Sequence, residues 1–325
     1  MSAWLLRRFA YALVNLFAVN LLTFALFFVV NTPDDMARMQ LGNKRVSAEA
    51  IERWKQEKGY DRPQWFNASA SGPGRWTDTL FFEKSVRLFL FDFGNDIDGR
   101  SIREEILARM GPSLALAVPV FLVGLAFNIT FALGMAFFRG TALDLSGRIA
   151  CIGLMSVSSL FYIISGQYLV SKVFALAPIS GFSGGFDALR FLVLPVVIGV
   201  LGGIGAGARF YRTLFLEEIG RDYVRTARAK GLSEWTVMFR HVLRNALIPI
   251  LTGVVAVIPT LFMGSLLAES FFGIPGLGSY TIDAIQAQDF LVVRSMVFLG
   301  SALYIVGLLL TDISYTLVDP RVRLE

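Results

Sequence analysis

The sequence predicts an all-α integral membrane protein with six transmembrane helices, both termini in the cytoplasm, and a large external loop between the first two helices. Of its 325 residues, 55% are hydrophobic and 17% are charged, whereas soluble domains carry about 25% charged residues. The mean hydropathy is positive, and several apolar runs reach the roughly 20 residues that a helix needs to cross a bilayer core. The cations gather in a few segments, and their placement sets the orientation.

Six apolar runs have the length of a span: Phe9–Val30, Leu114–Phe138, Ile149–Val170, Leu189–Ala208, Ile248–Leu267 and Val292–Leu310. They divide the chain into residues 1–30 (cytoplasmic N-terminus and first span), 31–112 (external region) and 113–325 (a core with the other five spans). The first run follows two arginines, as a signal peptide does. It is too long for the apolar part of one, and no small-residue cleavage site precedes Asn31, so we expect an uncleaved helix.

The distribution of Lys and Arg orients these spans, because short cytoplasmic loops carry an excess of both. Six spans place both termini on one side, and that side carries 14 cations. The short loops on the other side carry three, Lys172, Arg190 and Arg294. The long segment 31–112 holds 13 cations and 13 carboxylates and favours neither side. The expected orientation is therefore N-in and C-in, with a cytoplasmic loop at about 211–245.

The external segment 31–112 has the signals of a folded region. Ser47 is placed to cap a helix, with Val46 and Ile51 as a hydrophobic staple across the cap and Gly59 as the stop. The stretch "NASASGPGR" is typical of an exposed loop. The stretch "LFFEKSVRLFLF" is long enough for a short helix, which either lies on the membrane surface or packs onto the external ends of the spans.

The charged stretch 222–249 predicts two helices joined at a glycine. Tyr223, Val224 and Ala227 recur at helical spacing, and Gly231 ends that helix because glycine adopts left-handed backbone angles without penalty. Ser233 is a plausible cap for a second short helix that leads into the fifth span, with Pro249 near the start of that span. Its expected apolar face follows the i, i+3, i+4, i+7 pattern and consists of Trp235, Met238, Phe239, Val242 and Ala246.

Two interpretations of this stretch remain open. Its cations can simply fix the topology while the apolar stripe packs under neighbouring spans. Topology does not require small residues at 227 and 231 or a hinged helix pair, however. Those features favour a protruding segment whose backbone approaches a partner on the cytoplasmic face.

The segment "YVRTARAKGLSEWTVMFRHVLRNALIP" resembles the cytoplasmic loop of bacterial ABC-importer permeases, in the form found in the oligopeptide, dipeptide and nickel branch. The wider family has Glu-Ala-Ala, three residues, Gly, nine residues, then Ile-x-Leu-Pro. This chain keeps Ala227, Gly231 and Leu243 of that pattern. It departs from the pattern at four positions, in a way similar to the peptide branch's own version: Arg225, Thr226, His241 and Arg244.

Further blocks extend the resemblance over nearly the whole chain. They include the first span, "KGYDRPQWF" and "FDFGNDIDGRSIREEI" in the external region, "GIPGLGSYTIDAIQAQDF", and the ending "DISYTLVDPRVRL". Between Asn67 and Leu80 the sequence departs from the branch's shorter form. Docking details at that insertion are therefore not carried over.

The resemblance implies an ABC importer permease fold in the bacterial inner membrane and a set of partners. These are a second homologous permease, two cytoplasmic ATP-binding subunits that hold ATP and Mg²⁺, and a periplasmic solute-binding protein. The loop that would contact the ATPase, called the coupling helix in this family, corresponds here to Tyr223, Arg225, Thr226, Ala227, Arg228, Ala229, Lys230, Gly231 and Leu232. The cargo implied is a peptide or a peptide-like solute.

The residues themselves agree that this chain does not supply the energy for transport. It contains no G-x-x-x-x-G-K-[ST] motif, and "GGIGAGAR" at 202–209 lacks the phosphate-binding lysine. Gly199, Gly203 and Gly207 have the spacing of a helix contact. Apart from Arg294 near an edge, no span contains a charged residue, which argues against a proton or sodium relay. We therefore expect no cofactor, metal, nucleic acid or catalysis in this chain.

Several polar residues in the spans are candidates to line a neutral pathway, although hydrogen bonds between helices are the commoner use: Asn15, Asn20, Asn128, Ser156, Ser158, Ser159 and Gln167. Glu269 and Asp312 lie just beyond spans, where we expect solvated or salt-bridged side chains. His241 has no Cys or carboxylate partners in the sequence pattern that binds a metal, and the single cysteine, Cys151, excludes an intramolecular disulfide.

Three rival functions remain at this point. The same machinery can carry nickel or a peptide-like antibiotic. The chain can also be a channel or ion-coupled carrier that acts alone, or a structural scaffold without transport activity.

Overall fold

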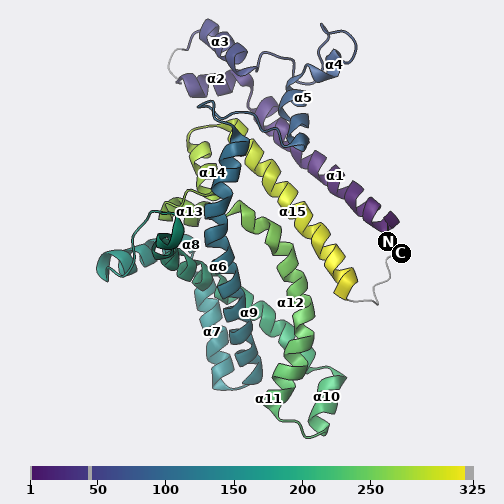
Figure 1. Ribbon diagram of the computed structural model, residues 1–325, viewed down its shortest axis with the longest axis vertical. Helices are drawn as coiled ribbons and strands as arrows, with labels where there is room; N and C mark the ends of the chain where they lie inside the picture. Colours follow the sequence, from purple (N-terminus) through teal and green to yellow (C-terminus); the bar gives the residue numbers. More distant parts are fainter. Residues whose placement is uncertain (1, 43–45, 319–325) are drawn as a thin grey trace. The chain divides into compact units, whose positions relative to one another are not determined.

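The structure is a computed structural model that describes residues 2–42 and 46–318. Within these residues every regular element is helical, apart from one isolated bridge between Asn95 and Ser101. The chain forms two compact units (Figure 1). Among the described residues, the first unit comprises those up to Ala108 together with Tyr280–Leu309, and the second comprises Arg109–Ser279 together with residues 310–318.

The first unit contains α1, the short helices that follow it, and parts of three later helices. Its elements up to residue 101 are α1 (Ser2–Phe24), a π-helical continuation (Ala25–Val30), α2 (Pro33–Leu41), α3 (Ala48–Lys58), α4 (Gly74–Thr77), α5 (Leu80–Lys84) and a 3-10 turn (Val86–Leu90). The unit also includes the start of α6 (Ile102–Phe137), the end of α14 (Leu277–Gln286) and most of α15 (Phe290–Val318).

The predicted signals around α3 are confirmed. The Ser47 hydroxyl accepts a hydrogen bond from the Ala50 amide at 3.3 Å, and Gly59 ends the helix with φ +68°. Ile51 and Trp54 are buried together with Phe24, and Val46 packs against the same cluster. This cluster anchors α2 and α3 to the first span within the unit.

The aromatic stretch at 80–91 packs onto spans, which decides between its two predicted positions. It forms α5 and the 3-10 turn rather than one helix, because Ser85 separates them. The rings of Phe81 and Phe24 lie 5.1 Å apart, and those of Phe89 and Phe298 lie 5.3 Å apart. The stretch is therefore attached to both α1 and α15.

The second unit holds the remaining helices. After α6 these are α7 (Ala142–Ser156), α8 (Ser159–Gly166), a π-helical continuation (Gln167–Val173), a 3-10 turn (Gly185–Asp187), α9 (Ala188–Ile219), α10 (Asp222–Ala229), α11 (Glu234–Thr236), a π turn (Val237–Val242), α12 (Leu243–Val257), a 3-10 turn (Ile258–Met263) and α13 (Leu266–Phe272).

Five described helices are long and apolar enough to cross a membrane, and a bent pair makes a sixth if it counts as one span. The five are Leu6–Val30, Ile102–Phe137, Ala188–Ile219, Glu234–Met263 and Phe290–Ser314. They coincide with predicted spans, which confirms the all-helical membrane fold. Two of them begin well before the predicted starts at Leu114 and Ile248, namely Ile102–Phe137 and Glu234–Met263. The amphipathic residues that precede each of these apolar runs continue the same helix.

The third predicted span, Ile149–Val170, is wrong as a continuous helix. The structure has α7, a break, and α8 with its π-helical continuation, with a bend of 88° between the two parts. Val157 and Ser158 are extended, and the Ser158 hydroxyl accepts a hydrogen bond from the Phe161 amide at 3.3 Å. The serine interpreted as a pathway candidate is thus the N-cap of a new helix.

The fifth span also ends earlier than predicted. Gly264 follows the 3-10 turn with φ +67°, and α13 begins at Leu266 as a separate helix. The expected end at Leu267 is therefore wrong, because the glycine backbone turns the chain inside an apolar run that composition does not interrupt.

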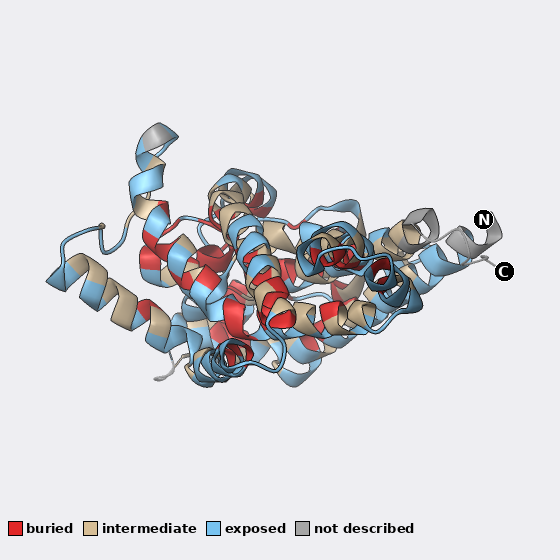
Figure 2. Ribbon diagram, turned by 90° about the horizontal axis from the view of Figure 1, so that it is seen from below, coloured by how far each residue is buried: buried red, intermediate tan, exposed pale blue. Residues whose placement is uncertain are grey.

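The long helices bury only part of their surface. Figure 2 shows them with exposed residues along much of their length. In α6, for example, Leu122, Val123 and Phe127 are about half exposed. Apolar side chains exposed in this number are typical of surfaces that face lipid or other membrane helices.

Candidate functional site: a helical elbow and an apolar groove

The charged stretch forms a helical elbow, which we define as residues 222–236. Its first helix, α10, runs from Asp222 to Ala229, and Gly231 follows with φ +75°. The Gly231 amide donates to the Arg228 carbonyl at 2.9 Å, which closes the turn. Ser233 caps α11, with its hydroxyl accepting from the Thr236 amide at 3.3 Å. The predicted hinge and cap are both confirmed.

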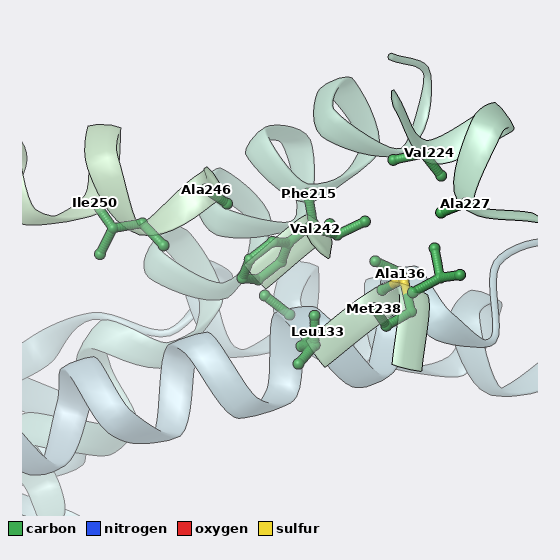
Figure 3. Packing of buried hydrophobic residues seen from close by; sticks show 11 residues of the cluster. Leu133, Ala136, Phe215, Val224, Ala227, Met238, Val242, Ala246 and Ile250 are labelled. Carbon is green, nitrogen blue, oxygen red and sulfur yellow. The ribbon is translucent and has the colours of Figure 1, made fainter. Parts of the chain in front are cut away.

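One face of α10 is inserted into a hydrophobic cluster. Val224 and Ala227 are buried, and they pack in one cluster with Phe215, Met238 and Val242. Figure 3 shows their side chains directed into the group that contains Phe215 and Met238. The cluster also includes residues of α6, so three helices form a base for the elbow. Ala227 is small because it contacts this base.

The opposite face of the elbow is open to solvent. Of the nine predicted coupling residues, Tyr223 is half-buried and Ala227 is buried. The other seven are exposed: Arg225, Thr226, Arg228, Ala229, Lys230, Gly231 and Leu232. The structure thus brings seven of the nine predicted residues together as one exposed ridge, while Ala227 belongs to the packed base.

Two polar contacts hold this ridge in shape. Arg228 donates to both carboxylate oxygens of Glu234, at 2.8 and 3.1 Å, and so bridges the two sides of the Gly231 turn. Tyr223 donates to Glu218 at 2.5 Å. Burial, with a smaller contribution from Glu218, raises the pKa of Tyr223 to about 12, so its phenol stays protonated as this donor. Glu234 was not among the predicted site residues.

The predicted second short helix is continuous with the fifth span. Residues Glu234–Met263 form one helical span, with a π turn at Val237–Val242. Met238, Val242 and Ala246 are buried as predicted, but Trp235 and Phe239 are 63% and 41% exposed. A π turn inserts an extra residue and rotates the helix face. This rotation buries Val237 and leaves the two aromatic residues outside, with their ring centroids 4.2 Å apart.

An apolar groove lies beside the break at Gly264 in the second unit. Two adjoining cavities, of about 480 and 280 Å³, share Pro195, Gly199, Gly264, Ser265 and Ala268 in their walls. No charged residue lines either cavity. The larger cavity is also lined by Ser159, one of the predicted pathway candidates.

The other pathway candidates lie elsewhere. Asn15 and Ser156 are exposed on their helices, and the Ser156 hydroxyl donates to the Ile152 carbonyl. Asn20 donates to the Ser85 carbonyl at 2.9 Å. Gln167 donates to the carbonyls of Ile179 and Phe271. Asn128 is buried against Gly207, and a side chain added at Gly207 would collide with the Asn128 amide group.

Glu269 corrects the expectation of a solvated or salt-bridged side chain. It is fully buried, and its carboxylate accepts hydrogen bonds from the backbone amides of Ser265, Gly278 and Ser279, at 3.1, 2.7 and 3.2 Å. Burial raises the pKa of Glu269, while these hydrogen bonds oppose the shift. A side chain at Gly264 would collide with the same carboxylate. Glu269 therefore holds α13, one wall of the groove, to the start of α14.

No group of three or more His, Cys, Asp and Glu suitable for a metal ion occurs within residues 2–42 and 46–318. His241 is half-buried in the π turn that follows the elbow. Cys151 is a buried free thiol on α7.

Comparisons with known proteins agree with this architecture. Residues 106–324 match the family described as the inner membrane component of binding-protein-dependent transport systems, and residues 1–69 match the N-terminal part of such membrane components. A peptide transport system permease protein of Brucella abortus is 33% identical over the full length of both chains. The dipeptide transport system permease protein of Escherichia coli is 31% identical over 99% of each chain, and the di/tripeptide permease of Pseudomonas aeruginosa is 32% identical over 99% of each.

Proposed function

The chain belongs to the family of inner-membrane components of binding-protein-dependent transport systems, and from this premise we propose that it is a transmembrane subunit of an ATP-driven importer of peptides or peptide-like solutes. In this proposal the elbow receives mechanical force from a separate cytoplasmic ATPase. The helices that carry the groove then form part of the translocation pathway. The names of the relatives, which transport peptides, dipeptides or di- and tripeptides, support this cargo over nickel.

The observation that carries the coupling role is the two-faced structure of α10. Its inner face is buried against Phe215 and Met238, so a push on the helix is transmitted to α9 and to the fifth span instead of bending a loose loop. Its outer face carries Arg225, Thr226 and Ala229 into solvent. A ligand that binds one conformation more tightly than another shifts the equilibrium between them by that difference. An ATPase bound to this ridge has such a route to the spans.

The pathway role rests on the uncharged groove at Gly264. A neutral, mostly apolar wall does not hold a solute tightly, which suits a subunit whose solute is selected by a separate periplasmic binding protein. The remaining partners in this proposal are a second homologous permease and two ATP-binding subunits. This chain would form one half of the pathway wall, and the second permease would form the other half. Asn15, Asn20, Asn128, Ser156 and Gln167 stay candidates for movement into the pathway in another conformation.

A cysteine cross-link tests the contact with the ATPase. Cys151 is fully buried, so a cysteine placed at exposed Thr226 is the reactive thiol of the chain. In membranes that contain the whole transporter, Thr226→Cys should cross-link to an ATP-binding subunit through a short linker with a maleimide at one end and an amine-reactive ester, for lysines of the partner, at the other. Ser69→Cys, exposed in the external segment, is the matched control and should give no such product. Absence of the Thr226 product in an active transporter would contradict the coupling proposal.

The same two variants test the orientation. A membrane-impermeant maleimide should label Ser69→Cys from outside intact cells and Thr226→Cys only in inverted vesicles. Uptake by vesicles that contain this chain alone, driven by an ion gradient, would instead support the solitary carrier.

A further inference from the structure

Three arginines line an open cavity beside the contact between α7 and α9. Arg148 comes from α7, and Arg209 and Arg212 come from α9. The cavity has a volume of about 480 Å³ and lies within the second unit. It is separate from the groove at Gly264, and neither the groove nor the elbow accounts for its charge.

The wall of this cavity carries more positive charge than the nearby carboxylate neutralises. Asp144 is buried and accepts hydrogen bonds from Nε and Nη2 of Arg212, both at 2.9 Å. Arg148 lies 3.7 Å from the same carboxylate. In the described part of the chain Arg209 has no carboxylate partner, and its Nη1 donates to the Met155 sulfur at 3.6 Å, a weak acceptor. Three cations and one carboxylate leave a net charge of +2 at the cavity.

The rest of the wall is apolar and continues onto an exposed apolar surface. It consists of Met155, Ala206 and Phe210, together with the Thr213 side chain. Met155 is 48% exposed and Phe210 is 60% exposed. Ile152, one turn before Met155 on α7, is exposed as well. Exposed apolar surface on a spanning helix is typical of a face that contacts acyl chains. The cavity therefore joins cationic donors to a surface suited to hydrocarbon.

The position of Arg209 along α9 places the cations near a membrane surface. The part of α9 from Ala188 to Arg209 is about 32 Å long. The hydrocarbon core of a bilayer is about 30 Å thick. A helix that enters the core at Ala188 thus reaches the opposite boundary close to Arg209. Headgroup phosphates lie at this boundary, next to the acyl chains.

We propose that this cavity binds one anionic phospholipid, with its phosphate at Arg209 and Arg148 and an acyl chain along Met155 and Phe210. Guanidinium groups bind phosphate oxygens through charge-assisted hydrogen bonds, and basic pockets between membrane helices bind anionic headgroups. A zwitterionic lipid fits less well, because its cationic group is repelled by the same arginines. This site goes beyond the proposed function and does not depend on the cargo.

Lipid binding to the purified full-length chain in detergent tests this inference. The probes are phosphatidylglycerol, phosphatidylcholine with the same acyl chains, and water-soluble glycerol phosphate. Native mass spectrometry gives the dissociation constant of the first bound molecule of each. Phosphatidylglycerol should bind at least fivefold more tightly than either of the other two. Equal affinity for the two lipids would overturn the charge argument, and equal affinity for glycerol phosphate would overturn the lipid assignment.

Variants then place the lipid at the cavity. Arg209→Gln should weaken phosphatidylglycerol binding at least fivefold, and because Arg209 is exposed the change should leave the fold intact. Arg139→Gln is the matched control, since Arg139 is exposed between α6 and α7 and does not line the cavity. It should retain the wild-type affinity. Ala206→Trp fills the cavity without changing a charge and should also weaken binding at least fivefold.

Two outcomes of the variant experiment would overturn the proposal. An equal loss of affinity in Arg139→Gln and Arg209→Gln would show that the lipid responds only to overall charge. Unchanged affinity in Arg209→Gln and Ala206→Trp would show that the lipid lies elsewhere.

The complete transporter distinguishes a lipid from a protein partner at the same arginines. With a lipid in the cavity, Arg209→Gln should leave co-purification of the second permease unchanged, and the complete transporter should keep its preference for phosphatidylglycerol. If carboxylates of the second permease cover Arg209 instead, the variant should lose that permease and the complete transporter should show no lipid preference. This second result would overturn the lipid assignment.

Discussion

Substitution of Gly231 tests whether the backbone of the elbow turn, rather than a side-chain contact, makes this residue necessary. Gly231 has φ +75°, and a Cβ added there meets no atom within 4 Å. The penalty for a side chain is therefore conformational. Left-handed backbone costs an ordinary residue about 1–2 kcal/mol, while Asn adopts it more readily. A penalty of that size lowers the ratio of native to altered turn by roughly 5- to 30-fold.

The expected order of transport activity is Gly, then Asn, then Ala, then Val. The assay is the initial rate of dipeptide uptake in vesicles that contain the complete transporter, normalised to the amount of this chain in the membrane. Insertion and abundance should stay near those of the wild type, because the strain is local to an exposed turn. Association with the ATP-binding subunits, measured by co-purification, should fall in the same order.

Gly140 offers a matched control. It also has a positive φ, +80°, with no atom within 4 Å of an added Cβ, and it lies between α6 and α7 outside the elbow. Gly140→Ala should therefore strain the backbone equally without reducing uptake or ATPase association. The reasoning is refuted if Gly231→Asn loses more activity than Gly231→Ala, because loss would then follow side-chain size. Normal transport by Gly231→Val would refute the elbow assignment itself.

Three further substitutions separate the base of the elbow, its turn and the groove wall. Ala227→Leu should destabilise the purified chain by about 1–3 kcal/mol through overpacking of a buried site. Ala229→Leu, on the exposed face, should leave thermal stability unchanged and weaken ATPase co-purification. Equal melting temperatures of the two variants would contradict this assignment of faces. Glu234→Arg should reduce uptake with at most about 1 kcal/mol change in stability, because the pair with Arg228 is exposed. Adding Arg228→Glu to the same chain should restore uptake. Absence of this rescue would show that the pair does not shape the turn. Glu269→Ala leaves three buried amides without an acceptor, which costs about 1–3 kcal/mol for each amide. The melting temperature should therefore fall by about 6 °C or more. A fall no larger than that of the control Glu217→Ala, at an exposed carboxylate, would contradict the anchoring role.

Local sequence signals predicted those features that depend on a few neighbouring residues. Ser47 and Gly59 bound α3, and Gly231 and Ser233 bound the two sides of the elbow turn, because caps and left-handed turns are decided by residues within one helical turn. Five of the six spans were likewise predictable from composition over about 20 residues. The break at 157–158 was missed because the capping signal of Ser158 occurs inside an apolar run, where polar residues were interpreted as pathway candidates.

Other features required contacts between distant segments. Glu269 looks like an exposed residue at the end of a span, but amides nine and ten residues later make its burial tolerable. Trp235 and Phe239 fit an apolar helical face until the π turn at 237–242 rotates that face. Arg294 was counted with the loop cations and as a charge near the edge of the last span, and its burial depends on Ser85, 209 residues earlier in the chain.

The sequence by itself determined that this chain is a helical membrane component, where five of its apolar spans lie, and where the glycine turn of the elbow lies, because hydropathy, charge and caps act over short stretches of chain. Only the tertiary structure decided which polar side chains are buried, which face of α10 is anchored, and where cavities open beside Gly264 and Arg209. Those outcomes depend on which distant groups supply a hydrogen bond or fill a space, and no local pattern of residues specifies that.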